Sequence, residues 1–168
     1  MIDCSDKIIV KSMKLNYFRK YLTNGFNKGI LDEIRFFTSN DLSYMSDKLN
    51  SHFILLENDG KIIGLCKLAN YISDDINTYS IGFFTINKEF RNKGYSRMMV
   101  DELFKLAKQN KWKIKTSSYT YVGFIKLRNI FNEYSEKHLV EFIDKKDDDS
   151  LIDTESMYDD KLIHRDEY

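Results

Sequence analysis

Apolar residues along this chain are grouped in two ways, and each grouping predicts one kind of element. Short runs rich in β-branched and aromatic residues predict strands; they cover residues 7–13, 52–57, 61–68, 78–86, 112–118, 139–143 and 157–164. Apolar residues repeated every three or four positions predict amphipathic helices; they cover residues 16–26, 39–49, 96–110 and a segment that begins at Thr120. Strands that alternate with helices require crossover connections, so the pattern predicts a mixed sheet covered by helices.

The clearest local signal is a hairpin within residues 52–68. Two apolar runs flank Asn58-Asp59-Gly60, and an Asp-Gly pair tolerates the positive φ that a tight turn between strands demands. The acidic run at 147–149 is typical of a further turn, which would pair the last two predicted strands. The chain has no visible repeat and no Gly/Ser linker, so we expect a single domain over residues 1–168.

Composition agrees with a globular domain, and the charge pattern adds detail. The 168 residues are 42% hydrophobic and 14% aromatic, which is enough for a packed core. The 26 basic and 26 acidic residues cancel, which excludes a uniformly basic surface. The balance is uneven, because residues 86–128 hold 11 basic and 3 acidic residues whereas residues 144–168 hold 4 and 10. We therefore expect a middle segment that faces phosphate groups, offset by an acidic end.

Cysteines and long apolar segments are both scarce. Cys4 and Cys66 are too few for a disulfide framework and lack metal-ligand spacing, and Cys66 is expected to be a packed thiol. Residues 1–11 carry no signal-peptide pattern, and no run approaches the roughly 20 apolar residues of a membrane span. We therefore expect a cytoplasmic protein that needs no metal and does not associate with a membrane.

The segment richest in chemistry is Arg91-Asn92-Lys93-Gly94-Tyr95-Ser96, which joins a buried strand to an amphipathic helix. The free N–H groups at a helix N-terminus bind phosphate oxygens, and Gly94 lets a ligand approach the backbone closely. Arg91, Lys93 and Arg97 would add positive charge around a phosphate. The plainer alternative is that Gly94 only turns the chain while the lysines belong to a solvated helix face.

This strand–loop–helix segment resembles the acyl-CoA motif of the GNAT superfamily of N-acyltransferases. In the family pattern, Arg or Gln and then Gly are separated by two intervening residues, and Gly or Ala follows after one further intervening residue; here these positions are Arg91, Gly94 and Ser96. The resemblance implies an α/β (α+β) fold with a mixed, mostly antiparallel sheet of about six or seven strands flanked by helices. It also implies an N-acetyltransferase that moves the acetyl group of acetyl-CoA, its co-substrate, directly to a primary amine.

Carried over residue by residue, the resemblance assigns a cofactor-binding set. The set is Phe84, Thr85, Ile86, Arg91, Asn92, Lys93, Gly94, Tyr95, Ser96 and Arg97. In the family, the loop amides bind the CoA pyrophosphate, the strand holds the pantetheine arm, and a strand N–H near Ile86 helps the oxyanion. The sequence departs from the family at Ser96, at Leu127 in place of an Asn, and at His138-Leu139 in place of Gly-Phe.

The groups that would move protons are less evident in the sequence. The resemblance makes Tyr134 the catalytic candidate that protonates the leaving thiolate, although Tyr134 also continues an apolar helical stripe and would serve equally as a core aromatic. Tyr119 and Tyr121 are rivals for that role. The strand at 78–86 has no carboxylate to act as a base, and the nearby Glu57, Asp74 and Asp75 are expected to be turn or surface residues.

Two other classes of function stay open on the sequence. The missing strand carboxylate and the departures from the family motif favour a catalytically inactive GNAT-like binding or interaction protein. A nucleic-acid binder would use the basic middle, but the acidic end and the lack of an aromatic-interleaved basic patch count against it, so nucleic acid is not expected. The acceptor would be a small-molecule or protein amine, and edge strands leave open the pairing of two copies as a homodimer.

Overall fold

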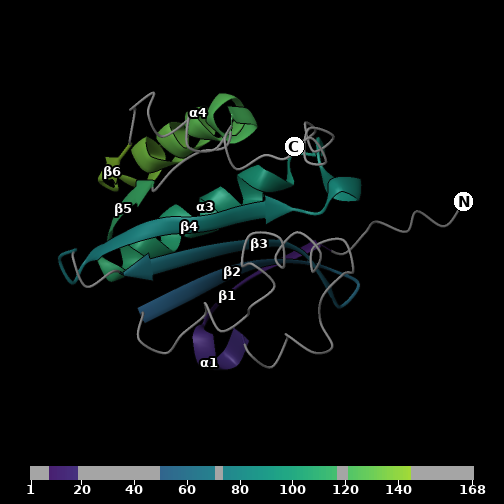
Figure 1. Cartoon of the computed structure of the whole chain (residues 1–168), viewed down its shortest axis with the longest axis horizontal. Helices are drawn as coiled ribbons and strands as arrows, with labels where there is room; N and C mark the ends of the chain where they lie inside the picture. The colour runs from purple at the N-terminus through teal and green to yellow at the C-terminus, as the bar shows by residue number, and fades with distance from the viewer. Residues whose placement is uncertain (1–7, 19–49, 71–73, 117–120, 145–168) are drawn as a thin grey trace, which may run out of the picture.

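The computed structural model describes residues 8–18, 50–70, 74–116 and 121–144 (Figure 1). The described elements, in chain order, are β1 (Ile8–Lys14), α1 (Leu15–Phe18), β2 (Asn50–Asn58), β3 (Lys61–Asn70), β4 (Thr78–Ile86), the 3₁₀ turn η3 (Lys88–Phe90), α3 (Tyr95–Asn110), β5 (Lys113–Thr116), α4 (Tyr121–His138) and β6 (Phe142–Ile143). No helix in these ranges is both long enough and apolar enough to cross a membrane.

The strands form one sheet in the order β1-β2-β3-β4-β5-β6. The first three pairs of neighbours are antiparallel, and the β4–β5 and β5–β6 pairs are parallel. The expected mixed, mostly antiparallel sheet is therefore confirmed, with six strands in the described part of the chain. The predicted hairpin is β2–β3, and its turn places Asp59 at φ 48° and Gly60 at φ 78°.

The two faces of the sheet are covered differently. Ile54, Leu56 and Cys66 point to the face on which α3 and α4 pack side by side. Gly64 lies on this face without a side chain, because a Cβ there would be 2.9 Å from Met99 Sδ. On the opposite face Phe18 of α1 stacks on Phe53 of β2. Figure 1 shows α1 and α4 on opposite sides of β1 and β2.

Two predicted strands begin later than expected, and both corrections have the same cause. The strand predicted at 139–143 is only Phe142–Ile143, because α4 ends with Leu139 in the left-handed region and the Val140 N–H bonded to Ser135 O. The strand predicted at 112–118 begins at Lys113, because Lys111 and Trp112 close α3 in the same way, and residues 117 and 118 lie outside the described ranges. Residues that the apolar pattern assigned to strands therefore belong to the capping turns at the ends of the helices.

Several sequence-based expectations fall outside the described residues. They are the continuation of the first helix beyond Phe18, the helix predicted at 39–49, the acidic turn at 147–149 and the strand at 157–164. The other predicted strands and helices are confirmed, with bounds close to those expected.

Candidate functional site

The sheet opens between β4 and β5. Their parallel ladder joins Thr78–Ile81 to Lys113–Thr116, so the rest of β4 has no β5 partner within the residues that the structure describes. Beyond this ladder β4 continues to Ile86 and then turns into the loop before α3. The last residues of β4 therefore present one backbone edge to the space beside α4.

Hydrogen bonding to β3 fixes which backbone groups line that edge. The Asn87 N–H donates to Ile63 O at 2.7 Å, and Gly64 lies opposite Ile86 in the ladder. Backbone groups of successive strand residues point to opposite sides, so the N–H and C=O of Ile86 and of Phe84 point away from β3. These groups are the ones available to an extended ligand laid along β4.

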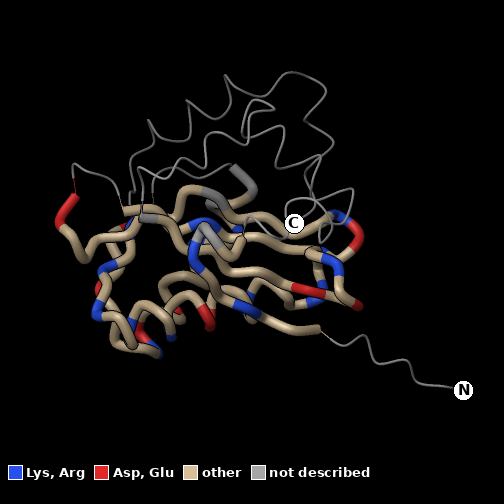
Figure 2. The backbone as a smooth tube through the Cα atoms, turned by 90° about the horizontal axis from the view of Figure 1, so that it is seen from below, with Lys and Arg blue, Asp and Glu red and all other residues tan. Residues whose placement is uncertain are grey.

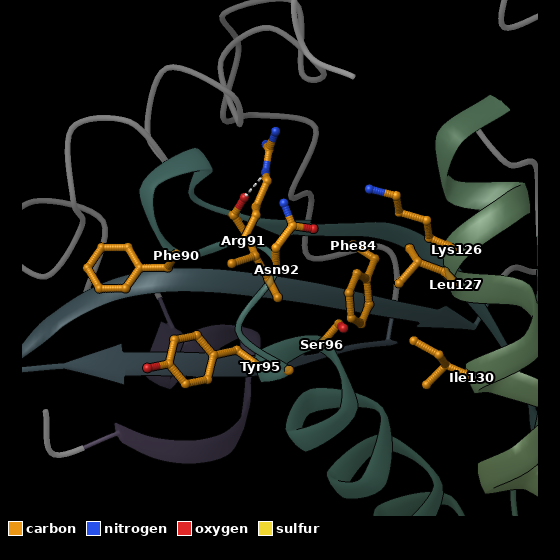
Figure 3. Close-up of a pocket in the computed structure, with 11 residues that line it drawn as sticks. Phe84, Phe90, Arg91, Asn92, Tyr95, Ser96, Lys126, Leu127 and Ile130 are labelled. Carbon is orange, nitrogen blue, oxygen red and sulfur yellow. Dashed lines mark hydrogen bonds between the residues drawn. The ribbon is translucent and has the colours of Figure 1, made fainter. Parts of the chain in front are cut away.

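A pocket of about 190 Å³ lies at this opening. It is lined by the end of β4, the loop before α3 and the start of α4, through Phe84, Ile86, Phe90, Arg91, Asn92, Gly94, Tyr95, Ser96, Lys126, Leu127 and Ile130. Figure 3 shows the Lys126 amino group reaching from α4 toward Asn92 and Arg91, with the Phe84 ring facing Leu127 and Ile130. One wall of the pocket is therefore apolar and the other is formed by backbone and polar groups.

The start of α3 forms the polar wall. Gly94 is the N-cap at φ 81°, and no side chain accepts a hydrogen bond from the first turn of the helix. The Arg97 N–H donates to Gly94 O at 3.2 Å, which leaves the amides of Tyr95 and Ser96 at the helix start without a capping side chain. Uncapped amides at the positive end of a helix dipole favour an anion.

Arg91 lines the pocket but is mainly a structural residue. Its side chain is buried, and its Nε donates to Ile86 O at 2.7 Å, shown as a dashed line in Figure 3. This contact satisfies a carbonyl on the open edge of β4 and ties the loop to the strand. The β4 edge thus offers a ligand the N–H of Ile86 and both backbone groups of Phe84.

Three residues of the expected cofactor-binding set do not line the pocket. Thr85 is fully buried, on the face of the sheet opposite to Phe84 and Ile86. The Lys93 amino group lies over the Phe90 ring, 5.4 Å from its centroid. The Arg97 guanidinium instead donates hydrogen bonds to both carboxylate oxygens of Glu133 on α4.

Tyr134 lies outside the pocket as well. It is half-buried one turn beyond Ile130 on α4, and the Lys137 amino group sits 5.0 Å from its ring centroid. Hydrogen bonding, first with Glu133 and then with Tyr134, raises the pKa of Arg97. The catalytic role of Tyr134 stays a prediction. Tyr119 and the side chain of Tyr121 are outside the described residues.

Four pocket residues were not in the expected set: Phe90, Lys126, Leu127 and Ile130. The sequence had already marked Leu127, because it replaces the Asn of the family pattern. Lys126 and Ile130 lie beside the apolar stripe of the helix that contains Leu127. A helical spacing of three or four from Leu127 would have found Ile130. Nothing in the sequence pattern marks Lys126 among the many lysines of this segment.

The three carboxylates near β4 have structural partners. Asp75 accepts from the Asn77 N–H and the Thr78 hydroxyl, which lower its pKa, and Asp74 pairs with Lys115, so both are turn residues as expected. Glu57 corrects the expectation of a turn or surface residue. It is 8% exposed on β2, where the Lys11 ammonium, 2.7 Å away, neutralises its charge.

Metal ligands do not gather in the described part of the chain, where no three His, Cys, Asp or Glu side chains could hold an ion together. Cys66 is fully buried, and burial raises the pKa of its thiol. The expectation of a packed, unreactive thiol is confirmed.

Comparison with known proteins gives a family match. The sequence matches the model described as Acetyltransferase (GNAT) family over residues 16–123. A search of curated protein sequences finds no match.

Three solved structures illustrate the structural likeness. A protein from Desulfovibrio desulfuricans, described as an acetyltransferase of the GNAT family, is 12% identical, covering 78% of this chain and 83% of that chain with a TM-score of 0.48. A GNAT-family N-acetyltransferase from Escherichia coli in complex with CoA is 13% identical, covering 70% and 66%, with a TM-score of 0.48. A GNAT-family acetyltransferase from Staphylococcus aureus is 23% identical, covering 65% and 84%, with a TM-score of 0.40. Because these identities and TM-scores are low, family membership rests on the sequence match.

Proposed function

This chain belongs to the GNAT family of acetyltransferases, and from that premise we propose that it is an N-acetyltransferase acting on acetyl-CoA and a primary amine. One observation carries the proposal: the open edge of β4, the uncapped start of α3 and the first turns of α4 converge on one pocket. That pocket combines the two features a CoA arm needs, a phosphate-binding end and a strand edge.

The phosphate end would be the start of α3. The pyrophosphate oxygens would accept hydrogen bonds from the amides of Tyr95 and Ser96, and the Ser96 hydroxyl would add a donor. Lys126 would supply positive charge from the facing wall. Gly94 provides the left-handed turn that brings these amides to the ligand, a conformation that most residues adopt only with strain.

The strand edge would hold the pantetheine arm. An extended amide chain placed beside Phe84 and Ile86 would exchange backbone hydrogen bonds with them, in the manner of an added strand. The Phe84 ring, which packs edge-on against Phe131 at 5.7 Å, together with Leu127 and Ile130 would cover the apolar part of the arm.

The reaction would be direct transfer. The amine nitrogen, as the neutral base, attacks the thioester carbonyl carbon and forms the new C–N bond. The tetrahedral intermediate then breaks its C–S bond, the thiolate leaves, and the proton lost by nitrogen ends on sulfur. A β4 N–H would stabilise the oxyanion. Tyr134 stays the candidate proton donor, although it does not line the pocket.

Calorimetric titration with acetyl-CoA tests the binding half of the proposal. We expect saturable binding, weakened about tenfold in Lys126→Met, because a hydrogen bond to a charged group is worth roughly 1.5–3 kcal/mol. Lys108→Met is the matched control, since Lys108 is an exposed lysine in the last turn of α3, away from the pocket. Absence of binding at about millimolar acetyl-CoA, where only very weak complexes are missed, would remove the proposed function.

Turnover separates an enzyme from the second candidate, a GNAT-like binding protein without catalysis. That alternative is favoured by the position of Tyr134 outside the pocket and by the lack of a carboxylate on β4. CoA release with a panel of amines would establish the enzyme, and binding without release would establish the binding protein. A Tyr134→Phe variant should lose about 10²-fold or more in kcat if the phenol protonates sulfur, and nothing if it only packs.

A further inference from the structure

A second pocket, of about 580 Å³, lies at the end of the sheet away from the loop before α3. The end of β1, the start of β2, α1 and the last turns of α3 form it, through Ser12, Met13, Lys14, Tyr17, His52, Leu106 and Asn110. Ser96 lines the first pocket and Leu106 the second, and ten residues of one helix span about 15 Å. The second pocket is therefore separate from the proposed acyl-CoA site, and its volume is within the range of small-molecule sites.

The second pocket is open to solvent. Ser12, Lys14 and Asn110 are exposed residues, and Tyr17 is 57% exposed. His52 is half-buried. Each polar side chain that lines the pocket is therefore at least partly accessible to a molecule that arrives from solvent.

Two basic side chains lie next to each other in this pocket. Lys14 of β1 is directly opposite His52 of β2, so both side chains are on the face of the sheet that α3 covers. The His52 ring packs against Tyr79 and Trp112, but neither His52 nor Lys14 has an ion pair or a hydrogen bond within the described part of the chain. Burial, and then the charge of Lys14, lower the pKa of His52, and no carboxylate opposes them. An anion placed between the two side chains would relieve this repulsion.

The rest of the pocket suits a single negative charge on an apolar body. Met13, Leu106 and the ring of Tyr17 supply apolar surface, and no Asp or Glu is among the described residues that line the pocket. The pocket also includes the end of α3 at Asn110, whose side-chain amide donates to Leu106 O. The carbonyl groups at a helix C-terminus carry partial negative charge, which disfavours a dianion such as phosphate. A carboxylate has only the one charge that Lys14 can neutralise.

We propose that this pocket is a second ligand site, which takes a small organic carboxylate and holds it between Lys14 and His52. The Lys14 ammonium would donate to one carboxylate oxygen, and a ring N–H of His52 would donate to the other. The apolar part of the ligand would lie against Met13 and Leu106. Because the two pockets share no lining residue, this site would exist whether or not the protein acts on acetyl-CoA.

NMR titration of the ¹⁵N-labelled full-length protein tests the site. The probes are benzoate and hexanoate, and their neutral matches are benzamide and hexanamide, which have the same shape without the charge. We expect saturable shifts of the amide signals of Lys14, His52 and Asn110, with the acids binding about ten times more tightly than the amides. Lys14→Met should weaken acid binding about tenfold, because a hydrogen bond to a charged group is lost. Lys61→Met is the control, because Lys61 is an exposed lysine of β3 outside both pockets.

The pH dependence of benzoate binding tests the part played by His52. Among the described residues, Lys14 is the only charged side chain that lines the pocket with His52, and the phenols of Tyr17 and Tyr79 are the other titratable groups near the imidazole. Protonation of His52 adds a second positive charge, so benzoate, which stays ionised, should bind more tightly at about pH 5.5 than at about pH 7.5. A His52→Phe variant keeps an aromatic ring at this position and should lose that difference.

Several results would overturn this second site. Acids that bind no better than their amides would do so, as would a Lys14→Met protein that binds benzoate as tightly as the unchanged protein. Binding that is lost in Lys126→Met but kept in Lys14→Met would place the acid in the acyl-CoA pocket. Phenyl phosphate that binds more tightly than benzoate would contradict the assignment to a carboxylate, and an equal pH dependence in His52→Phe would contradict the role of His52.

Discussion

The Arg91 guanidinium ties the loop before α3 to the end of β4. Its Nε donates to the Ile86 carbonyl on the edge of β4 that faces the pocket, and its side chain is only 7% exposed. A carbonyl in that position would otherwise face an apolar opening without a donor. Arg91 therefore positions the phosphate-binding amides, whatever contact it makes with the phosphates themselves.

Replacing Arg91 with Met should lower stability as well as affinity. The lost charge-assisted hydrogen bond is expected to cost about 2 kcal/mol of the free energy of unfolding, measured by urea denaturation. Acetyl-CoA affinity should fall too, because the loop loses its anchor. Arg97→Met is the matched control: its ion pair with Glu133 is exposed, so less than about 1 kcal/mol is expected. Equal stability of Arg91→Met and the unchanged protein would contradict the structural role.

The residues of the candidate site could be predicted from the sequence only where residues close together in the chain set the conformation. Gly94 and Ser96 line the pocket as expected, because a glycine turn followed by a helix start is encoded within a few residues. Arg97 and Tyr134 do not line it, because Arg97 is captured by Glu133, 36 residues away. A contact of that range leaves no spacing pattern in the sequence.

Among the secondary-structure elements, the apolar pattern located the centres of strands and helices but not their ends. α3 and α4 end with Lys111 and Leu139 in the left-handed region, at φ 58° and 57°. Glycine usually occupies such a C-terminal turn, but neither helix has a glycine at that position. Their ends are set instead by the return of Trp112 and Val140 to the core, where both are partly buried. The later starts of β5 and β6 therefore could not be predicted from the sequence.

The aromatic contact between β2 and β4 predicts a pH dependence of stability. His52 packs against Trp112 at 4.6 Å and Tyr79 at 5.9 Å between ring centroids. Burial, and then the charge of Lys14, lower the pKa of His52 below its usual value. The fold therefore favours the neutral imidazole, so this stabilisation is present above about pH 6.5 and is lost as the pH falls below it.

The measurement is the urea midpoint at about pH 7.5 and pH 5.5, on either side of the usual histidine pKa. The midpoint should fall on acidification, and the fall should be smaller in His52→Phe, which keeps the ring but cannot gain a proton. Carboxylates that titrate in the same range contribute equally to both proteins and cancel in the comparison. An equal fall in both proteins would show that His52 does not contribute.

Across the fold, four of the 11 basic residues in the middle of the sequence form ion pairs with distant acidic residues. Pairs across the fold are Arg97–Glu133, Lys115–Asp74, Arg128–Asp144, and Lys113 with Asp75 and Glu141. Figure 2 shows basic and acidic positions interspersed along the described backbone. The sequence count of 11 basic and 3 acidic residues in 86–128 therefore overstates the charge available to a ligand. The proposed phosphate binding would therefore rely on the amides at the start of α3 and on Lys126 more than on a basic surface.

The architecture was the part most accessible from sequence. Alternating strands and helices required a mixed sheet, and the motif before α3 marked where its strands separate.

A crystal structure of the protein with acetyl-CoA tests the central claim most directly. We expect pyrophosphate oxygens at about 2.7–3.2 Å from the amides of Tyr95 and Ser96, and the pantetheine arm hydrogen-bonded to Phe84 and Ile86. The Arg91 bond to Ile86 should remain in place. A CoA molecule bound elsewhere, or crystals at millimolar acetyl-CoA with this pocket holding only water, would contradict the assignment of the pocket as an acyl-CoA site.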